Sequence, residues 1–247
     1  MKKSLYIFLI SLLIFSVGIY YLHLSWWLLL IPCLNFIFDL VFGAIYIQKN
    51  FYVDSVNNLQ SSKQREICLT FDDGIHADLT PKVLDILKQK NVKAIFFLIG
   101  KNIIGNEAIL KRMYDEGHQI GNHSYEHTFW FDMKSSNAML EEIETTTQLI
   151  NSIIGKQIAL FRPPYGVTNP NLARAIKKSG LQSIGWSLRS FDTTAKSTTQ
   201  LLTKLKLETK AQDIVLLHDR CEITVNALTE YIDFCQERGF TFVTLKS

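Results

Sequence analysis

The stretch ICLTFDDG, residues 67–74, is a mostly apolar run followed by two aspartates and a glycine. We predict a short buried strand over residues 67–71, followed directly by Asp72, Asp73 and Gly74. Six similar runs lie further along the chain, with helical patterns between them, and are predicted as strands at residues 94–99, 119–121, 158–161, 183–188, 214–217 and 241–245. Continuous apolar strands joined by crossover helices indicate a parallel sheet covered on both faces.

The fold class is therefore α/β with about seven parallel strands, arranged as a barrel with fewer than eight repeats or as an open doubly wound sheet. In both arrangements the chemistry belongs at the carboxyl ends of the strands. Residues 66–247 are predicted to form this domain, and residues 49–65, which are mostly polar, to form a linker before it.

The first 48 residues have a different composition and are predicted to be a membrane anchor. Between residues 4 and 48 the only full charge is Asp39. One straight helix of this length would be about twice as long as the hydrocarbon core is thick, so two spans fit better, at about residues 5–24 and 26–47. The second span is weaker because Pro32 and Asp39 lie inside it. The sequence is compatible with one N-terminal transmembrane helix and with a helical hairpin. A cleaved signal peptide is the competing interpretation.

Charge and cysteine spacing exclude several classes of protein. The 247-residue chain has a formal net charge of +3, which does not indicate a nucleic-acid partner. Its four cysteines form no CxxC pair. This spacing argues against a thiolate zinc site, a thioredoxin-type site and a dense disulfide scaffold.

Three polar residues at predicted strand ends are of the types that bind a metal ion. His123 and His127 stand four residues apart after the third strand, a spacing that puts both imidazoles on one face of a helical turn. With Asp73 they would form a set of two histidines and one carboxylate that leaves coordination positions open. Asp72 would then act as a general base on the metal-bound water. A plain β-turn and a pair of surface histidines are the alternatives.

Two further strand ends carry candidate acid–base groups. Arg162 begins the sequence RPPYG and could hold Asp72 ionised and oriented, while the stiff loop could aim a backbone N–H at a developing oxyanion. His218 ends the sixth strand and is the candidate general acid. Asp192 could fix the tautomer of His218, brace Arg162 or cap a helix. The alternative for the RPPYG motif is an ordinary helix-entry loop, and the alternative for His218 is a histidine at the barrel rim without a catalytic role.

Together these motifs resemble a known family. The order TFDDG (residues 70–74), HSYEH (123–127), RPPYG (162–166) and LLH (216–218) is similar to the polysaccharide deacetylases, the chitooligosaccharide-deacetylase-homology domain of carbohydrate esterase family 4. The resemblance covers residues 66–245. It implies a distorted seven-stranded (β/α) barrel, one divalent metal ion, commonly zinc, and hydrolysis of N-acetyl, sometimes O-acetyl, groups on glycans. Such an enzyme is a hydrolase acting on carbon–nitrogen bonds other than peptide bonds.

The resemblance also implies a role for each matching residue. Water on the metal would be the nucleophile, Asp72 the general base and His218 the general acid. Asp73, His123 and His127 would be the metal ligands. Arg162 would tether the base, Tyr165 would stabilise the oxyanion through its backbone N–H, and Leu216 would line the pocket for the acetyl methyl group. The family often has Asp-x-x-Asp-Trp after the fifth strand. Here Asp192 keeps the second Asp, whereas Arg189 and Thr193 stand in place of the first Asp and the Trp.

The sequence therefore predicts a membrane-anchored, metal-dependent deacetylase with an acetylated glycan and the lipid bilayer as partners. A tethered glycan-binding protein without turnover and a hydrolase of the same fold acting on a non-glycan amide are the alternatives. For the side of the membrane, Lys2, Lys3 and Lys49 would draw both ends of a two-span hairpin to the cytoplasm. A single span at residues 5–24 would place the domain outside, with residues 26–47 at the membrane surface or packed against the barrel. The extracytoplasmic side is expected because most such polymers lie there.

Overall fold

The computed structural model describes residues 1–60 and 65–245, so parts of the predicted linker and of the domain's last residues lie outside the described residues. The described strands run side by side in the order β1-β6-β5-β4-β3-β2-β8-β7, with β9 paired to β2, and each of these pairings is parallel. Their bounds are β1 (Ser55–Val56), β2 (Glu66–Gly74), β3 (Ile95–Leu98), β4 (Gln119–Asn122), β5 (Leu160–Phe161), β6 (Gln182–Ile184), β7 (Leu188–Arg189), β8 (Ile214–His218) and β9 (Thr241–Phe242).

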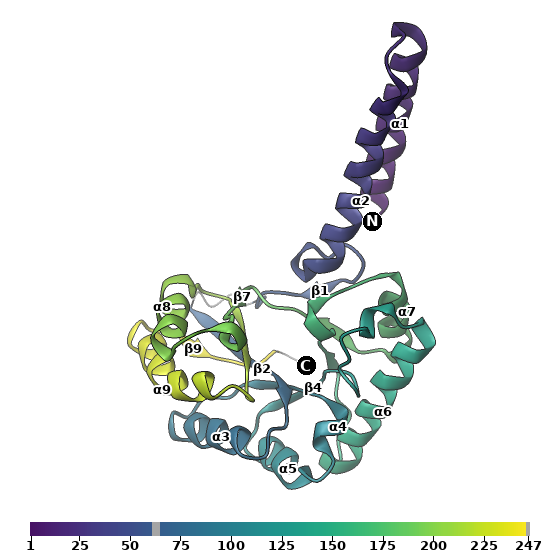
Figure 1. The fold of residues 1–247 in the computed structure, drawn as a ribbon. Coiled ribbons are helices and arrows are strands. Elements are labelled where there is room, and N and C mark those ends of the chain that lie inside the picture. The colour runs from purple at the N-terminus through teal and green to yellow at the C-terminus, as the bar shows by residue number, and fades with distance from the viewer. Residues whose placement is uncertain (61–64, 246–247) are drawn as a thin grey trace.

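Helices cover the outside of these strands on the sides away from β7 and β1 (Figure 1). They are α3 (Leu79–Gln89), α4 (Gly100–Ile103), α5 (Glu107–Asp115), α6 (Ser136–Ile154), α7 (Pro170–Ser179), α8 (Thr198–Glu208) and α9 (Glu222–Glu237). Local sequence sets the ends of α6: the Ser135 side chain accepts a hydrogen bond from the Ala138 amide, and Gly155 closes the helix with a φ of 69°. The predicted (β/α) barrel with parallel strands is confirmed.

The central strand β2 determines which side chains point into the barrel. It is buried along almost its whole length, between β3 and β8. Because side chains alternate along a strand, Leu69 and Phe71 pack in the apolar cluster shared with the outer helices. Cys68 belongs to the inner cluster with Trp186 and Leu216. Two and four residues further on, Thr70 and Asp72 therefore point into the barrel as well.

The predicted strand at residues 183–188 is instead two short strands, one next to the first strand of the order and the other at its far end. β6 lies next to β5 and β1, whereas β7 lies next to β8. Between them the Gly185 amide donates to the Val56 carbonyl, and the Ser187 amide donates to the Ile214 carbonyl. The segment thus leaves one edge of the sheet and joins the other, which brings the two edges together around the barrel.

The predicted linker also differs from its expectation, because part of it belongs to the barrel. Ser55 and Val56 form β1, which pairs with β6. Ser55 is buried and its hydroxyl lies 2.7 Å from the Ser183 hydroxyl. Leu59 is also buried. The described part of residues 49–65 is therefore packed against the domain.

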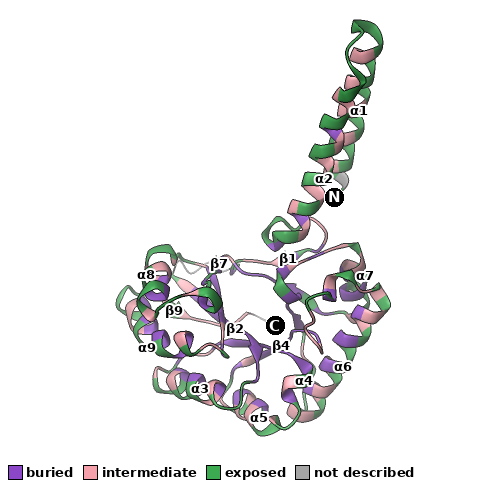
Figure 2. Ribbon diagram, in the orientation of Figure 1, coloured by how far each residue is buried: buried purple, intermediate pink, exposed green. Residues whose placement is uncertain are grey.

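The N-terminal residues form an antiparallel helical hairpin that projects from the barrel (Figure 1). It consists of α1 (Lys2–Leu22) and α2 (Leu30–Ile45), and both helical segments are long and apolar enough to cross a membrane. Figure 2 shows that most of the hairpin is exposed, in contrast to the buried strands. The Phe8 and Phe36 rings stack at 4.6 Å, and the Ser4 hydroxyl donates to the Asp39 carboxylate. The second helix thus pairs with the first and does not pack along the barrel.

The base of the hairpin contacts the domain near Thr168 and Trp186. The Thr168 amide donates to the Ala44 carbonyl at 2.9 Å. The Gln48 side-chain amide donates to the Trp186 carbonyl at 3.1 Å, and Ile47 is buried in the inner cluster. The hairpin is therefore joined directly to the barrel rim.

Candidate active site

Asp73, His123 and His127 come together at the carboxyl ends of β2 and β4. Their ligand atoms all lie within 4.8 Å of one another, and Asp73 Oδ1 is 3.5 Å from Nε2 of each histidine. Asp73 and His127 have left-handed backbone φ angles of 71° and 50°. Such conformations are unfavourable for these residues and are concentrated at functional sites. The structure thus brings the three predicted ligands to one point.

The surroundings of the two histidines suit metal binding. His123 Nδ1 lies 2.7 Å from the Arg162 carbonyl oxygen, so the Nδ1–H tautomer donates there and leaves the Nε2 lone pair facing Asp73. Burial, and next the nearby His123, lower the pKa of His127 to about 4. Two imidazoles and one carboxylate suit a divalent ion with open coordination positions. The residues present therefore fit the metal that the sequence predicts.

Asp72 lies beside this cluster and is held by Arg162. The Arg162 Nη1 donates to Asp72 Oδ1 at 2.7 Å and to the Thr70 hydroxyl at 2.7 Å. The other donors of Arg162 bond the carbonyls of Ile184 and Gly185, and its guanidinium lies 4.1 Å from the Phe97 ring centroid. Since this arginine is fully buried, the ion pair is fixed in one geometry, with Asp72 Oδ2 3.7 Å from His123 Nε2.

His218 stands on the other side of the carboxylates and is oriented by Asp192. His218 Nδ1 lies 2.8 Å from Asp192 Oδ1, and the His218 amide donates to Asp192 Oδ2 at 2.7 Å. Burial disfavours the charged imidazole, but the hydrogen bond and charge of Asp192, followed by the charges of Asp72 and Asp73, outweigh it and raise the pKa of His218. Of the roles left open for Asp192, the structure shows contact with His218, while the donors of Arg162 bond other groups.

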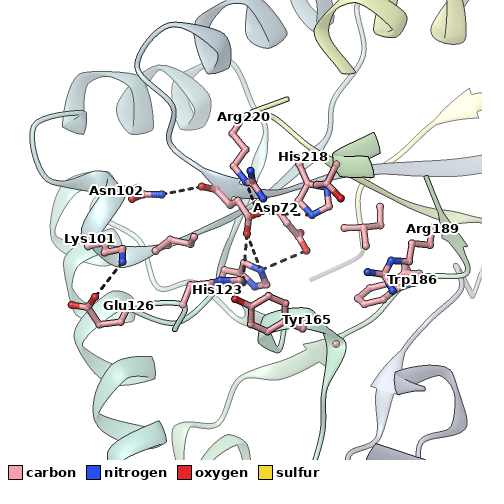
Figure 3. A pocket seen from close by; sticks show the side chains of 16 residues that line it. Asp72, Lys101, Asn102, His123, Glu126, Tyr165, Trp186, Arg189, His218 and Arg220 are labelled. Atoms are coloured by element: carbon pink, nitrogen blue, oxygen red, sulfur yellow. Dashed lines mark hydrogen bonds and ion pairs between the residues drawn. The ribbon is translucent and has the colours of Figure 1, made fainter. Parts of the chain in front are cut away.

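A cavity of about 350 Å³ connects these groups (Figure 3). Leu216 and Trp186 give it an apolar wall. The exposed Tyr165 has a φ of 58°, and its ring centroid lies 4.7 Å from that of His127. Arg189 and Thr193, which depart from the family pattern, also line the cavity. The site residues predicted from the sequence therefore lie in this cavity or directly behind it.

Among the site residues that the sequence analysis does not predict, Arg220 and Trp186 contact predicted ones. Arg220 Nε donates to Asp73 Oδ2 at 2.7 Å, which leaves Oδ1 directed at the histidines. Trp186 packs against Gly166, where an added Cβ would lie 2.3 Å from its ring. The position of Arg220, two residues after His218 at a strand end, is the one signal that could have pointed to it. Trp186 carries no such signal because it lies within an apolar run.

Comparisons with known proteins agree with this geometry. Residues 60–184 match the family model described as polysaccharide deacetylase. The chain is 34% identical over 200 residues to the peptidoglycan-N-acetylglucosamine deacetylase PgdA of Listeria monocytogenes. The aligned region is 81% of this chain and 42% of that protein. It is 32% identical over 191 residues to the peptidoglycan-N-acetylmuramic acid deacetylase PdaA of Bacillus subtilis, covering 76% of this chain and 72% of that protein.

A solved structure shares the fold as well. A carbohydrate esterase family 4 pseudoenzyme from Bacillus anthracis superposes with a TM-score of 0.68 at 25% identity, over 74% of this chain and 64% of that one. The barrel alone therefore does not establish turnover, whereas the matched residues and the two relatives establish ancestry. The chain belongs to the polysaccharide deacetylase family of hydrolases.

Proposed function

We propose that this chain is a metal-dependent N-deacetylase of a peptidoglycan-type glycan. The observation that carries the proposal is the convergence in one cavity of the Asp73–His123–His127 cluster with an Arg162-held carboxylate and an Asp192-held imidazole. Both relatives described above are named for peptidoglycan deacetylation. O-acetyl groups are a second possible substrate of the same site, because ester and amide hydrolysis share the same carbonyl chemistry.

The metal would be held by Asp73, His123 and His127, with zinc as the proposed ion. When bound, a divalent ion supplies Lewis-acid polarisation of the acetamide carbonyl and lowers the pKa of water. Asp72 takes the proton of the attacking water, and the fixed Arg162 ion pair keeps this carboxylate oriented. Arg220 holds the outer oxygen of Asp73.

The other half of the reaction needs a proton for the departing amine. His218 Nε2 lies 3.9 Å from Asp73 Oδ2, across the cavity from Tyr165 in Figure 3, so its proton faces the reacting group. Asp192 holds Nδ1 and favours the protonated imidazole. We assign the Tyr165 backbone N–H to the carbonyl oxygen and Leu216 to the acetyl methyl group.

We further propose that the hairpin anchors the enzyme in a membrane and that the domain faces the extracytoplasmic side. The exposed apolar side chains of both helices and their length support the anchor. Pairing of Asp39 with Ser4 supports a membrane position for α2, because it gives the one carboxylate of the hairpin a hydrogen-bonding partner. The extracytoplasmic side follows from the location of the proposed substrate.

The test is acetate release by the full-length protein in detergent. Peptidoglycan strands, chitin oligomers and an acetylated exopolysaccharide are compared, with an acetylated non-glycan amide as the control substrate. Release from a glycan should stop after chelation and return on addition of a divalent ion. The proposal is wrong if the metal-loaded protein releases no acetate from these glycans, if release survives verified metal removal, or if only the non-glycan amide is hydrolysed.

A further inference from the structure

Among the described residues, the charged side chains that line the cavity are paired, with one exception. Lys101 contacts Glu126 at 3.2 Å and Arg220 contacts Asp73 at 2.7 Å. Arg189 also lines the cavity and is exposed. Within residues 1–60 and 65–245 we find no carboxylate partner for it. The cavity therefore presents one cation whose charge the protein does not neutralise.

Aromatic rings fix the position of this cation. The Arg189 guanidinium carbon lies 4.9 Å from the Phe191 ring centroid and 5.8 Å from that of Trp186. Stacking on rings orients a guanidinium plane and leaves its N–H groups available at the edge. Figure 3 shows Arg189 beside Trp186, across the cavity from the Lys101–Glu126 pair. A ligand that reaches from the Asp73 cluster toward Trp186 would meet this edge.

We propose that Arg189 makes the site selective for an acetamido sugar that carries a carboxylate, either on the acetylated sugar or on its neighbour. This inference rests on the proposed function and names its substrate class. A carboxylate matches the two parallel donors of a guanidinium, and it would neutralise the remaining charge of the cavity. An uncharged acetamido sugar would leave that charge without a partner.

The experiment compares oligosaccharides that differ in the carboxylate alone. One is a tetrasaccharide of alternating N-acetylglucosamine and N-acetylmuramic acid with its lactyl carboxylates free, and its control has the same carboxylates converted to methylamides. A hyaluronan tetrasaccharide, with the carboxylate on the neighbouring sugar, identifies which position is recognised. Both kcat/KM of the metal-loaded protein and Kd of the metal-free protein are measured, so that binding is tested even if turnover, and with it the proposed function, fails.

We expect wild type to prefer a free carboxylate over its matched methylamide by about 10- to 100-fold in kcat/KM or Kd, the range for a hydrogen bond to a charged group. Arg189→Gln should bring this ratio close to one, Arg189→Glu should reverse it, and Arg189→Lys should restore part of it. Lys204→Gln removes a cation 5.2 Å from the same Phe191 ring but outside the cavity and should keep the ratio. Equal binding of acid and methylamide by wild type, or an unchanged ratio in Arg189→Gln, would overturn the inference.

Discussion

We expect Asp192 to set the pH range in which His218, the proposed general acid, can donate a proton. A general acid acts in its protonated form, so activity should fall as pH rises through the pKa of His218, which Asp192 raises. Asp192→Asn removes the charge and should move the basic limb of kcat/KM to lower pH by about 1–2 units. The pH profiles of the two proteins on one glycan measure the shift.

Asp213→Asn is the matched control for this change. Asp213 is also a buried, hydrogen-bonded aspartate, held by the Ser187 hydroxyl, but it does not line the cavity. Its replacement should leave the basic limb in place. If the basic limb of kcat/KM does not shift in Asp192→Asn at full metal content, the titration of His218 does not cause that limb.

His127 is one of the three proposed metal ligands, so its loss should change metal content before anything else. In His127→Ala only two of the three proposed ligands remain. Metal affinity should therefore fall by more than the roughly 10- to 100-fold lost when a residue that hydrogen-bonds a ligand is removed. Metal per protein after gel filtration measures this. His76→Ala, which changes an exposed histidine outside the cavity, should retain the metal. Full occupancy in His127→Ala would exclude His127 as a ligand.

At the residue scale, the sequence predicts the groups whose type and spacing carry information. Parallel strands present their carboxyl ends at one end of the barrel. The two histidines, His123 and His127, therefore meet the pair Asp72 and Asp73 there. Arg220 could not be predicted, because an arginine in a loop is usually solvated and only the fold shows that it reaches Asp73. The contact of Asp192 with His218 was one of three open options until the geometry was known.

At the element scale, the RPPYG loop depends on Gly166. This residue has a φ of 70°, and an added Cβ would lie 2.3 Å from the Trp186 ring. Gly166→Ala should therefore cost about 1–2 kcal/mol for the left-handed backbone and about 1–3 kcal/mol more for the collision. It should also lower kcat/KM, because the loop carries Tyr165. Chemical denaturation and acetate release measure the two effects.

Gly180→Ala separates the two costs. Gly180 has a φ of 72° at the end of α7, with nothing within 4 Å of an added Cβ. It should show the backbone cost alone and keep its kcat/KM. If the two variants are equally stable and equally active, the contact between Gly166 and Trp186 does not position the loop.

Elements with a clear periodicity are predicted well, and the failures have physical causes. The helix at residues 136–154 is an example, because a serine cap and a glycine mark its two ends in the sequence. The run at residues 183–188 was wrong as one strand, because an apolar run does not reveal that the chain changes sheet edges. β1 has only two residues, which is too short for any alternation to be visible.

At the scale of the whole molecule, the hairpin brings the start of α1 to the domain. The Met1 amino group donates to the Phe51 carbonyl at 3.2 Å, so two membrane-spanning helices would leave the N-terminus and the domain on one side. Lys3 and Lys49 at this end favour the cytoplasm, whereas the proposed substrate favours the exterior. We expect the exterior, because the glycan that we propose as the substrate lies there and the charge bias is small.

Cysteine labelling in intact cells tests this orientation. Asn58→Cys is placed in a variant with Cys33 and Cys221 replaced, while Cys68 and Cys235 stay because they are fully buried. Asn58 is exposed beside β1. An impermeant maleimide should label intact cells, and the variant without the reporter sets the background. Labelling only after lysis would place the domain in the cytoplasm and point to an intracellular or lipid-linked acetylated sugar.

The most direct test of the central claim is acetate release by Asp72→Asn at full metal occupancy. Loss of one positioned proton transfer lowers the rate by roughly 10²–10⁴-fold, and the metal cluster of Asp73, His123 and His127 is untouched. We predict that Asp72→Asn binds metal like wild type and releases acetate from the glycan at least about 100-fold more slowly. Wild-type rates in this variant, with metal bound, would contradict the account.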